Sequence, residues 1–182
     1  MNETLKAIEN RYSCRDYASN PVDESLLQAI AKAAVQSPSA MNNQPWRIVV
    51  VTDQKLIAEM DKEGYKIFES WDDKTLYNVV KERGGAVCCN APCVIMIPMK
   101  AGAAMDCGIV CQNITIAAQS LGLSSLICWQ AGVALSGDRG PEFMKKMGFP
   151  EGYEFGMAVL IGYENVPGTP HEPDLSKISY VK

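Results

Sequence analysis

Short apolar segments typical of β-strands alternate with longer segments of helical periodicity along this chain, and this alternation constrains its fold class more than any other feature. Taken alone, it predicts a doubly wound parallel sheet with helices on both faces, of the flavodoxin-like or Rossmann type. The phosphate loops of those folds are missing, because neither G-x-G-x-x-G nor a loop rich in Ser, Thr and Gly follows the first predicted strand. The alternation by itself therefore leaves the fold open.

Five segments are predicted to be helices. Asp23 is expected as the N-cap of the second helix, which Pro38 ends. Gly64 and Gly122 are expected to end the third and the fourth, since glycine readily adopts the backbone conformation that follows a helix. The five predicted helices are Thr4–Asn10, Glu24–Ser37, Gln54–Asp61, Ala103–Leu121 and Pro141–Met147.

Four apolar segments are predicted to be strands, namely Trp46–Val51, Val94–Ile97, Leu126–Trp129 and Met157–Gly162. Residues 64–85 receive no assignment, because aromatic side chains are mixed there with many charges. These aromatic side chains are expected to pack in the core, or to sandwich an aromatic substrate if the segment forms a lid. The tail Glu164–Lys182 contains three prolines and is expected to wrap over another surface.

Length and charge narrow the class of protein. A chain of 182 residues suits a single domain, so residues 1–182 are expected to form one. A formal charge of −4 at pH 7 argues against electrostatic binding to nucleic acid. The longest apolar runs, such as Cys93–Pro98, are too short to span a bilayer, and residues 1–20 show no signal-peptide core. We expect a cytoplasmic protein that binds neither nucleic acid nor membrane.

The seven cysteines are expected to be buried apolar residues, not disulfide partners or metal ligands. Their number is odd, no pair has C-x-x-C spacing, and a single histidine offers little to a zinc site. No metal site is therefore predicted. A redox or metal-sensing role stays open as an alternative for Cys88, Cys89, Cys93, Cys107 and Cys111.

The segment Arg11-Tyr12-Ser13-Cys14-Arg15-Asp16-Tyr17 places two guanidinium groups on either side of a hydroxyl, directly after a predicted helix. Arginine suits planar, bidentate contact with phosphate, and serine adds a further donor. A bound flavin also needs a positive group near N1 and O2, because two-electron reduction leaves negative charge there. The alternative is a solvated basic turn whose arginines pair with Glu9 and Asp16.

A second polar segment, residues 37–46, reads Ser-Pro-Ser-Ala-Met-Asn-Asn-Gln-Pro-Trp and leads into the first predicted strand. Its backbone donors, hydroxyls and amides suit the uracil-like edge of a flavin, which presents both donors and acceptors. Pro38 and Pro45 stiffen the loop. The alternative is an ordinary capped turn with Trp46 in the core.

These two segments resemble the nitroreductase family, in which an Arg-x-Ser-x-Arg-x-aromatic opening is followed by Pro-Ser-x-x-Asn-x-Gln-Pro-Trp before the first strand. Further matches follow in the family's order. Asn90-Ala91-Pro92 precedes a strand, and residues 106–123 resemble the family's long dimer helix. Gly148–Tyr153 leads to Ile161-Gly162-Tyr163 as in its last strand. The resemblance covers nearly the whole chain, from about residue 5 to residue 163.

The resemblance implies an α+β sandwich in which helices flank a mostly antiparallel sheet, instead of the parallel sheet suggested above. It also implies an intertwined homodimer, with FMN bound between subunits and the tail 164–182 wrapped onto the partner. The implied activity is that of an oxidoreductase with a ping-pong cycle: NAD(P)H gives a hydride to FMN, and a nitroaromatic, quinone or activated alkene then takes the electrons. Hydride transfer requires no side-chain acid or base, so no catalytic residue is predicted.

The same resemblance supplies the expected cofactor-binding residues. Arg11 and Ser13 are expected at the FMN phosphate, with Tyr12 between them, and Arg15 beside N1 and O2. The partner's loop is expected to reach the flavin through Pro38, Ser39, Ala40 and Asn42, with Gln44 supporting that loop. The segment that lies against the isoalloxazine, where a backbone N–H faces N5, is expected to comprise Trp129, Gln130, Ala131 and Gly132.

Two departures from the family pattern bear on these expectations. The family tail supplies an Arg or Lys to the phosphate, whereas this tail reads His171-Glu172-Pro173-Asp174-Leu175, with Lys177 further on. FMN is then expected to bind more weakly than usual, or to depend on Arg11 and Arg15. The middle segment 61–85, which shapes the substrate pocket in the family, is short, so the choice of substrate is left open.

Other functions remain open beside the main expectation. The same fold hosts reductive dehalogenases and enzymes that cleave FMN to dimethylbenzimidazole, whose signatures lie in the lid. A flavin-binding regulator without turnover is the alternative from another class. In the long helix, Asp106 is expected to act as a cap or dipole partner, and Gln112 and Asn113 to bond across an interface.

Overall fold

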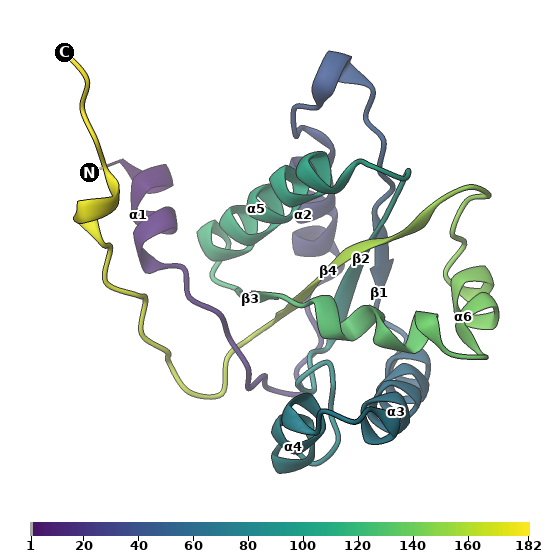
Figure 1. Cartoon of the computed structure of the whole chain (residues 1–182). Helices are drawn as coiled ribbons and strands as arrows, with labels where there is room; N and C mark the ends of the chain where they lie inside the picture. Colours follow the sequence, from purple (N-terminus) through teal and green to yellow (C-terminus); the bar gives the residue numbers. More distant parts are fainter. Residues whose placement is uncertain (1) are drawn as a thin grey trace.

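A four-stranded antiparallel sheet lies at the centre of the computed structural model, which describes residues 2–182 (Figure 1). The strand order is β1-β2-β4-β3, and every neighbouring pair is antiparallel. The strands are β1 Val49–Val51, β2 Cys93–Met99, β3 Ser124–Ile127 and β4 Glu154–Gly162. The α+β class with an antiparallel sheet is therefore confirmed, and the doubly wound parallel sheet that the alternation alone predicted is wrong.

The central strand β2 is apolar throughout because both of its faces are covered. Ile95 and Ile97 pack toward helices α2 (Glu24–Val35) and α5 (Ala104–Ser120). Val94 and Met96 point to the opposite face, as alternate residues of a strand do. That second face is covered by α3 (Gln54–Ser70), the 3-10 helix η2 (Trp129–Ser136) and α6 (Gly140–Lys146). Each fully buried aliphatic side chain stabilises the fold by about 1.5–3 kcal/mol.

Helix α3 is longer than the sequence predicted, since it continues through Gly64 to Ser70. Asp53 caps its start by accepting hydrogen bonds from the backbone N–H groups of Lys55 and Leu56. Gly64 does not end the helix but lets it approach η2, because a Cβ at this position would lie 2.9 Å from the side chain of Val133. A glycine inside a helix thus marks close packing here.

The unassigned residues 64–85 form the second half of α3 and helix α4 (Thr75–Glu82). Their aromatic residues pack against each other: the rings of Tyr65 and Tyr77 stack at 5.1 Å, and Phe68 meets Trp71 edge-on at 5.0 Å. Phe68 is fully buried in a small cluster with Val80. The packing role expected for these side chains is therefore confirmed for Phe68.

All four predicted strands differ from the observed ones at their ends: β2 extends beyond Val94–Ile97 on both sides, and β4 begins at Glu154, before the predicted Met157. The first strand begins at Val49, because Trp46 makes only an isolated bridge with Met99 before turning into the core. The third runs over Ser124–Ile127 and ends before Trp129, which starts η2. The other predicted helices agree with α1 (Glu3–Asn10), α2, α5 and α6 to within a few residues at their ends.

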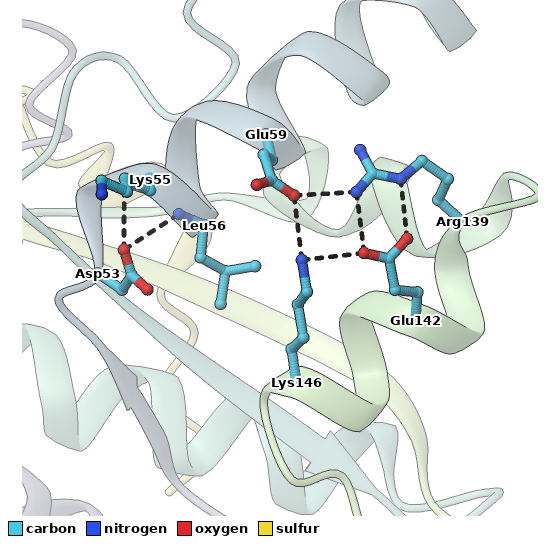
Figure 2. Close-up of polar contacts among 7 residues, drawn as sticks. All are labelled: Asp53, Lys55, Leu56, Glu59, Arg139, Glu142 and Lys146. Carbon is cyan, nitrogen blue, oxygen red and sulfur yellow. Dashed lines mark hydrogen bonds and ion pairs between the residues drawn. The ribbon is translucent and has the colours of Figure 1, made fainter.

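Four charged side chains connect α3 to α6, as Figure 2 shows. Glu59 of α3 accepts from Arg139 at 2.9 Å and from Lys146 at 3.2 Å. Glu142 of α6 pairs with the same two cations, at 3.0 Å and 2.9 Å. The hydrogen bond from Arg139 and the charge of Lys146 hold the pKa of Glu59 below its usual range. This network links α6 to α3, whereas η2 packs directly on α3, β4 and α6.

All seven cysteines are buried free thiols, so the burial expected for them is confirmed. Among residues 2–182, no helix combines the length and the apolar character that a membrane crossing requires. Beyond β4 the chain leaves the sheet as an extended tail with a short 3-10 helix, η3 (Leu175–Lys177). In Figure 1 this tail runs back beside α1 and ends near the N-terminus.

Candidate functional site

The Arg11–Tyr17 segment lies along the edge strand β3. Ser13 forms a parallel bridge with Ser125, and the backbone N–H of Cys14 donates to the carbonyl of Ser125 at 3.1 Å. The guanidinium of Arg15 folds back and donates to the carbonyl of Ser13 at 3.2 Å. Tyr17 is buried beneath the segment and anchors it in the core. The sheet edge therefore fixes the backbone that carries Arg11, Ser13 and Arg15.

The two arginines of this segment keep their positive charge available. No carboxylate of residues 2–182 lies within 4.0 Å of the Arg11 or Arg15 guanidinium. The pairing with Glu9 and Asp16 that the alternative interpretation required is wrong, since Asp16 instead accepts from the amide of Asn165 at 2.7 Å. Two uncompensated guanidinium groups at a fixed backbone segment are suited to an anionic group.

Beside them lies a buried hydroxyl that lacks a partner. Ser125 is 2% exposed, and among the described residues nothing hydrogen-bonds its Oγ. A buried hydroxyl without a partner costs about 1–3 kcal/mol, so most native ones are satisfied. Its neighbour Ser124, by contrast, donates to the carboxylate of Glu164. The unpartnered Ser125 hydroxyl lies on the strand with which Ser13 forms its bridge.

A cavity of about 310 Å³ brings Arg15 together with the segment after β3. Trp129 is half exposed at its wall, and Gln130 also lines it. Two parts of the expected site that are more than a hundred residues apart in the sequence thus meet in one place. The complete lining is Arg15, Val79, Arg83, Leu126, Ile127, Cys128, Trp129 and Gln130.

Other expected site residues have contacts that limit their roles. The Tyr12 hydroxyl donates to Glu164 at 2.6 Å, and its ring packs on Gly168, so this side chain holds the start of the tail. Ala131 and Gly132 are buried in η2. A Cβ at Gly132 would lie 2.1 Å from the ring of Phe155, which means that this glycine allows a close approach of η2 to β4.

The second polar loop, residues 37–46, is strained and well tethered. Met41, Asn42 and Gln44 have φ values of 51°, 54° and 45°, in the left-handed region that non-glycine residues seldom adopt. The backbone N–H of Gln44 donates to Ser39 Oγ at 2.9 Å, and its amide donates to Asn42 Oδ1 at 3.0 Å. Strained backbone of this kind clusters at ligand-binding sites. The capped turn of the alternative interpretation would not require such strain.

Helix α5 holds this loop through two polar side chains. The Ala40 N–H donates to the carboxylate of Asp106 at 3.1 Å, and the Asn113 amide donates to Ser37 Oγ at 2.9 Å. Asp106 was expected only as a cap or dipole partner, and Asn113 as an interface residue. Asp106 and Asn113 lie 66 and 76 residues from their partners in the sequence, so these contacts could not be predicted from sequence spacing.

The loop does not meet the Arg11–Arg15 segment within one chain. Figure 1 places the 3-10 helix η1 (Ala40–Asn42) beyond one end of α2, whereas the chain after α1 is bridged to β3 through Ser13. Met41, at the tip of the loop, is 93% exposed. Pro38, Ser39, Ala40, Asn42 and Gln44 are therefore separate from the other expected site residues in the single chain.

A second cavity, of about 570 Å³, lies on the other side of Trp129. Its walls include the aromatic side chains of Trp71, Tyr153 and Phe155, together with Met144. Because Trp129 lines both cavities, it separates a small space beside Arg15 from a larger aromatic one. A groove of about 940 Å³ between α2, α3 and β1 contains none of the expected site residues.

The architecture agrees with that of solved nitroreductases. A crystal structure of a nitroreductase with bound FMN from Desulfitobacterium hafniense is 48% identical, covers 100% of both chains and superposes with a TM-score of 0.96. A second, from Bacteroides fragilis and also with bound FMN, is 25% identical over 100% of both chains, with a TM-score of 0.89.

Sequence comparison agrees with the structural one. A protein of Archaeoglobus fulgidus, provisionally named NADH dehydrogenase/NAD(P)H nitroreductase, is 30% identical over 90% of this chain and 86% of its own. The profile of the Nitroreductase family matches residues 8–163. The chain therefore belongs to the nitroreductase family and is an oxidoreductase, as the resemblance predicted.

Proposed function

We propose that this protein is an FMN-dependent oxidoreductase that takes a hydride from NAD(P)H and passes the electrons to a small aromatic or quinone-like acceptor. The observation that carries this proposal is the edge of β3, where the segment that carries Arg11 and Arg15 pairs through Ser13 with Ser125, whose buried hydroxyl has no partner. The nitroreductases from Desulfitobacterium hafniense and Bacteroides fragilis were both crystallised with FMN, which supports the same cofactor here.

The residues present fit this cofactor in three places. Arg11 and Ser13 would hold the phosphate, beside the strand that carries the unpartnered Ser125 hydroxyl. Arg15 lies at the carbonyl edge of the ring, inside the 310 Å³ cavity. The backbone of residues 129–132 supports the ring plane. When bound, FMN supplies the hydride chemistry, so the chain contributes position and electrostatics and needs no catalytic side chain.

The remaining part of the site is proposed to come from a second copy of the chain. Pro38, Ser39, Ala40 and Asn42 of one copy reach the flavin of the other, and Gln44 keeps the loop in its strained shape through Ser39 and Asn42. This arrangement explains why the loop is rigid, exposed and remote from Arg11 in the single chain. Neither copy alone would contain a complete site.

Exposed apolar side chains support this homodimer. The tail 164–182 has little cover: Val166, Leu175 and Tyr180 are 68%, 69% and 82% exposed. We propose that residues 1–182 form one domain whose tail wraps onto the partner, where these side chains become buried. Light scattering at micromolar concentration is expected to give a mass near twice 19.9 kDa. A stable monomer that retains flavin would rule out the shared site.

The aromatic cavity of about 570 Å³ is the proposed acceptor site. Planar, electron-poor acceptors such as nitroaromatics, quinones or activated alkenes fit between aromatic walls, since stacked aromatic pairs are favourable by about 0.5–1.5 kcal/mol beyond the area that they bury. NAD(P)H and the acceptor use the site in turn, as in a ping-pong cycle. We place this activity in the cytoplasm.

One observation favours a second candidate, a flavin-binding regulator without turnover. His171 and Lys177, the tail residues nearest in sequence to the family's phosphate ligand, are exposed in the single chain, and Lys177 pairs with Asp174 at 3.7 Å. An absorbance spectrum of the purified protein, followed by anaerobic addition of NADH or NADPH, separates the two. The proposed enzyme is yellow and is bleached by at least one nucleotide. A yellow protein that neither nucleotide bleaches is the regulator.

A further inference from the structure

The cavity beside Arg15 contains a second guanidinium group. Arg83 follows the last residue of α4, is half-buried, and lines the cavity opposite the residues that follow β3. No carboxylate of residues 2–182 lies within 4.0 Å of it, as is also true of Arg15. A cavity of about 310 Å³ therefore holds two uncompensated positive charges.

The position of Arg83 is set by a thiol. Arg83 Nη1 donates to the sulfur of Cys89 at 3.7 Å, and Cys89 is 2% exposed. Burial raises the pKa of this thiol, against the opposing effect of Arg83, so the sulfur stays neutral at neutral pH. A neutral acceptor orients the guanidinium without cancelling its charge, which a carboxylate in the same place would do.

The turn that carries Cys89 is itself held in an unusual conformation. Cys89 and Asn90 have φ values of 54° and 59°, in the left-handed region. The preceding residue is fixed from α3, because the N–H of Cys88 donates to Asp61 Oδ1 at 2.8 Å. The path from Asp61 through the turn to Cys89 and Arg83 is thus continuous, and it ends in the cavity.

We propose that Arg83 acts with Arg15 on the carbonyl edge of the bound flavin and stabilises the negative charge that two-electron reduction leaves there, with Cys89 as its positioning residue. This inference rests on the proposed function. Two guanidinium groups in one cavity interact more strongly with the anionic reduced ring than with the neutral oxidised ring. Arg83 comes from the segment between α3 and β2, so this segment takes part in tuning the cofactor as well as in shaping the substrate pocket.

The test compares flavin binding in the two redox states. Arg83→Gln is expected to raise the Kd of reduced FMN about tenfold more than that of oxidised FMN, in the range for loss of a charge-assisted hydrogen bond. For a two-electron couple this ratio equals a fall of about 30 mV in the midpoint potential, measured by dye-equilibrated titration of protein saturated with FMN. Arg83→Lys keeps the charge but not the planar fork, and is expected to shift the potential by less.

Two further variants separate position from charge. Lys81→Gln removes one positive charge from the same helix outside this cavity, and its potential is expected to stay at the wild-type value. Cys89→Ala keeps the charge but removes the acceptor, so it is expected to shift the potential in the same direction as Arg83→Gln, by a smaller amount. A wild-type potential in Arg83→Gln, with Arg15→Gln lowered, would overturn the inference while leaving the proposed function intact. Failure of the wild-type protein to bind FMN at all would instead contradict the proposed function.

Discussion

Ser13 and Ser125 face each other across a parallel bridge at the edge of the sheet, and the Ser125 hydroxyl has no hydrogen-bond partner among the described residues. If the FMN phosphate supplies that partner, Ser125→Ala weakens flavin binding but does not lower the free energy of unfolding of the apoprotein. Removing an unsatisfied hydroxyl relieves a cost of about 1–3 kcal/mol, so the apoprotein is expected to be as stable as the wild type or more stable.

The neighbouring serine gives the matched control for this prediction. Ser124→Ala breaks a hydrogen bond to the Glu164 carboxylate, so it is expected to destabilise the apoprotein, by about 1.5–3 kcal/mol. Urea unfolding of the apoproteins and fluorescence titration with FMN measure both effects. Equal loss of stability in the two variants would show that Ser125 has an ordinary structural role.

Arg11→Ala is expected to weaken FMN binding by about 1.5–3 kcal/mol, the usual contribution of a hydrogen bond to a charged group. Other residues are expected to compensate little for the lost hydrogen bond, because the tail 164–182 contains no arginine. Fluorescence titration gives the Kd, and a steeper salt dependence in the wild type than in the variant is the expected signature of a lost charge. Flavin retained as tightly as in the wild type would remove Arg11 from the phosphate site.

Arg15→Gln is expected to make flavin reduction harder while disturbing oxidised binding less, because Arg15 interacts chiefly with the charge that reduction creates. A contribution of about 1–3 kcal/mol corresponds to a fall of roughly 20–60 mV in the two-electron midpoint potential. Arg15→Lys keeps the charge without the fork and is expected to recover part of that fall. Identical potentials in all three proteins would place Arg15 away from the pyrimidine ring.

The ion network between α3 and α6 predicts that the free energy of unfolding depends on pH in the acid range. The pKa of Glu59 is lowered by Arg139 and Lys146, so the folded state holds this carboxylate ionised at pH values where the unfolded chain already takes up a proton. The stabilisation is present above the unfolded pKa of about 4.3 and is lost as pH falls below it. Glu59→Gln is expected to lower the urea midpoint at pH 7, by a small amount because the pair is largely solvated.

The control for the network is an unpaired carboxylate of the same helix. Glu63 lies one turn further along α3 and forms no ion pair with any of residues 2–182, so Glu63→Gln is expected to leave the midpoint unchanged. The difference between Glu59→Gln and the wild type should also shrink in high salt. If the urea midpoints of Glu59→Gln and the wild type still differ by the same amount at low pH, the stabilisation does not come from the charge of Glu59.

Some parts of this fold could be predicted from local chemistry alone. The segments that became α2 and α5 end near Pro38 and Gly122, and β2 is a short continuous apolar run, so the type of these elements followed from the sequence. The strand order could not, because alternation along the chain does not say which strands become neighbours or in which direction. Only the likeness of whole motifs to a family predicted the antiparallel sheet.

The site divides in the same way. Arg11, Ser13 and Arg15 could be proposed from the sequence, because two arginines and a serine within five residues suit a phosphate group. Arg83 and Ser125 could be proposed only from the structure. Arg83 lies in a charge-rich segment, where one more positive residue does not by itself indicate a binding site. The burial of the Ser125 hydroxyl and its lack of a partner can be seen only in the folded chain.

The separation of the Arg11–Arg15 segment from the 37–46 loop has a genetic consequence. Let one chain carry Arg11→Ala and another Ser39→Ala, each defective as a homodimer. If the site is shared between two copies as proposed, then in a mixed dimer one site contains both substitutions, and the other combines an intact Arg11 with an intact Ser39. A cell that expresses both defective alleles would then recover activity that neither allele provides, through heterodimers with a single working site.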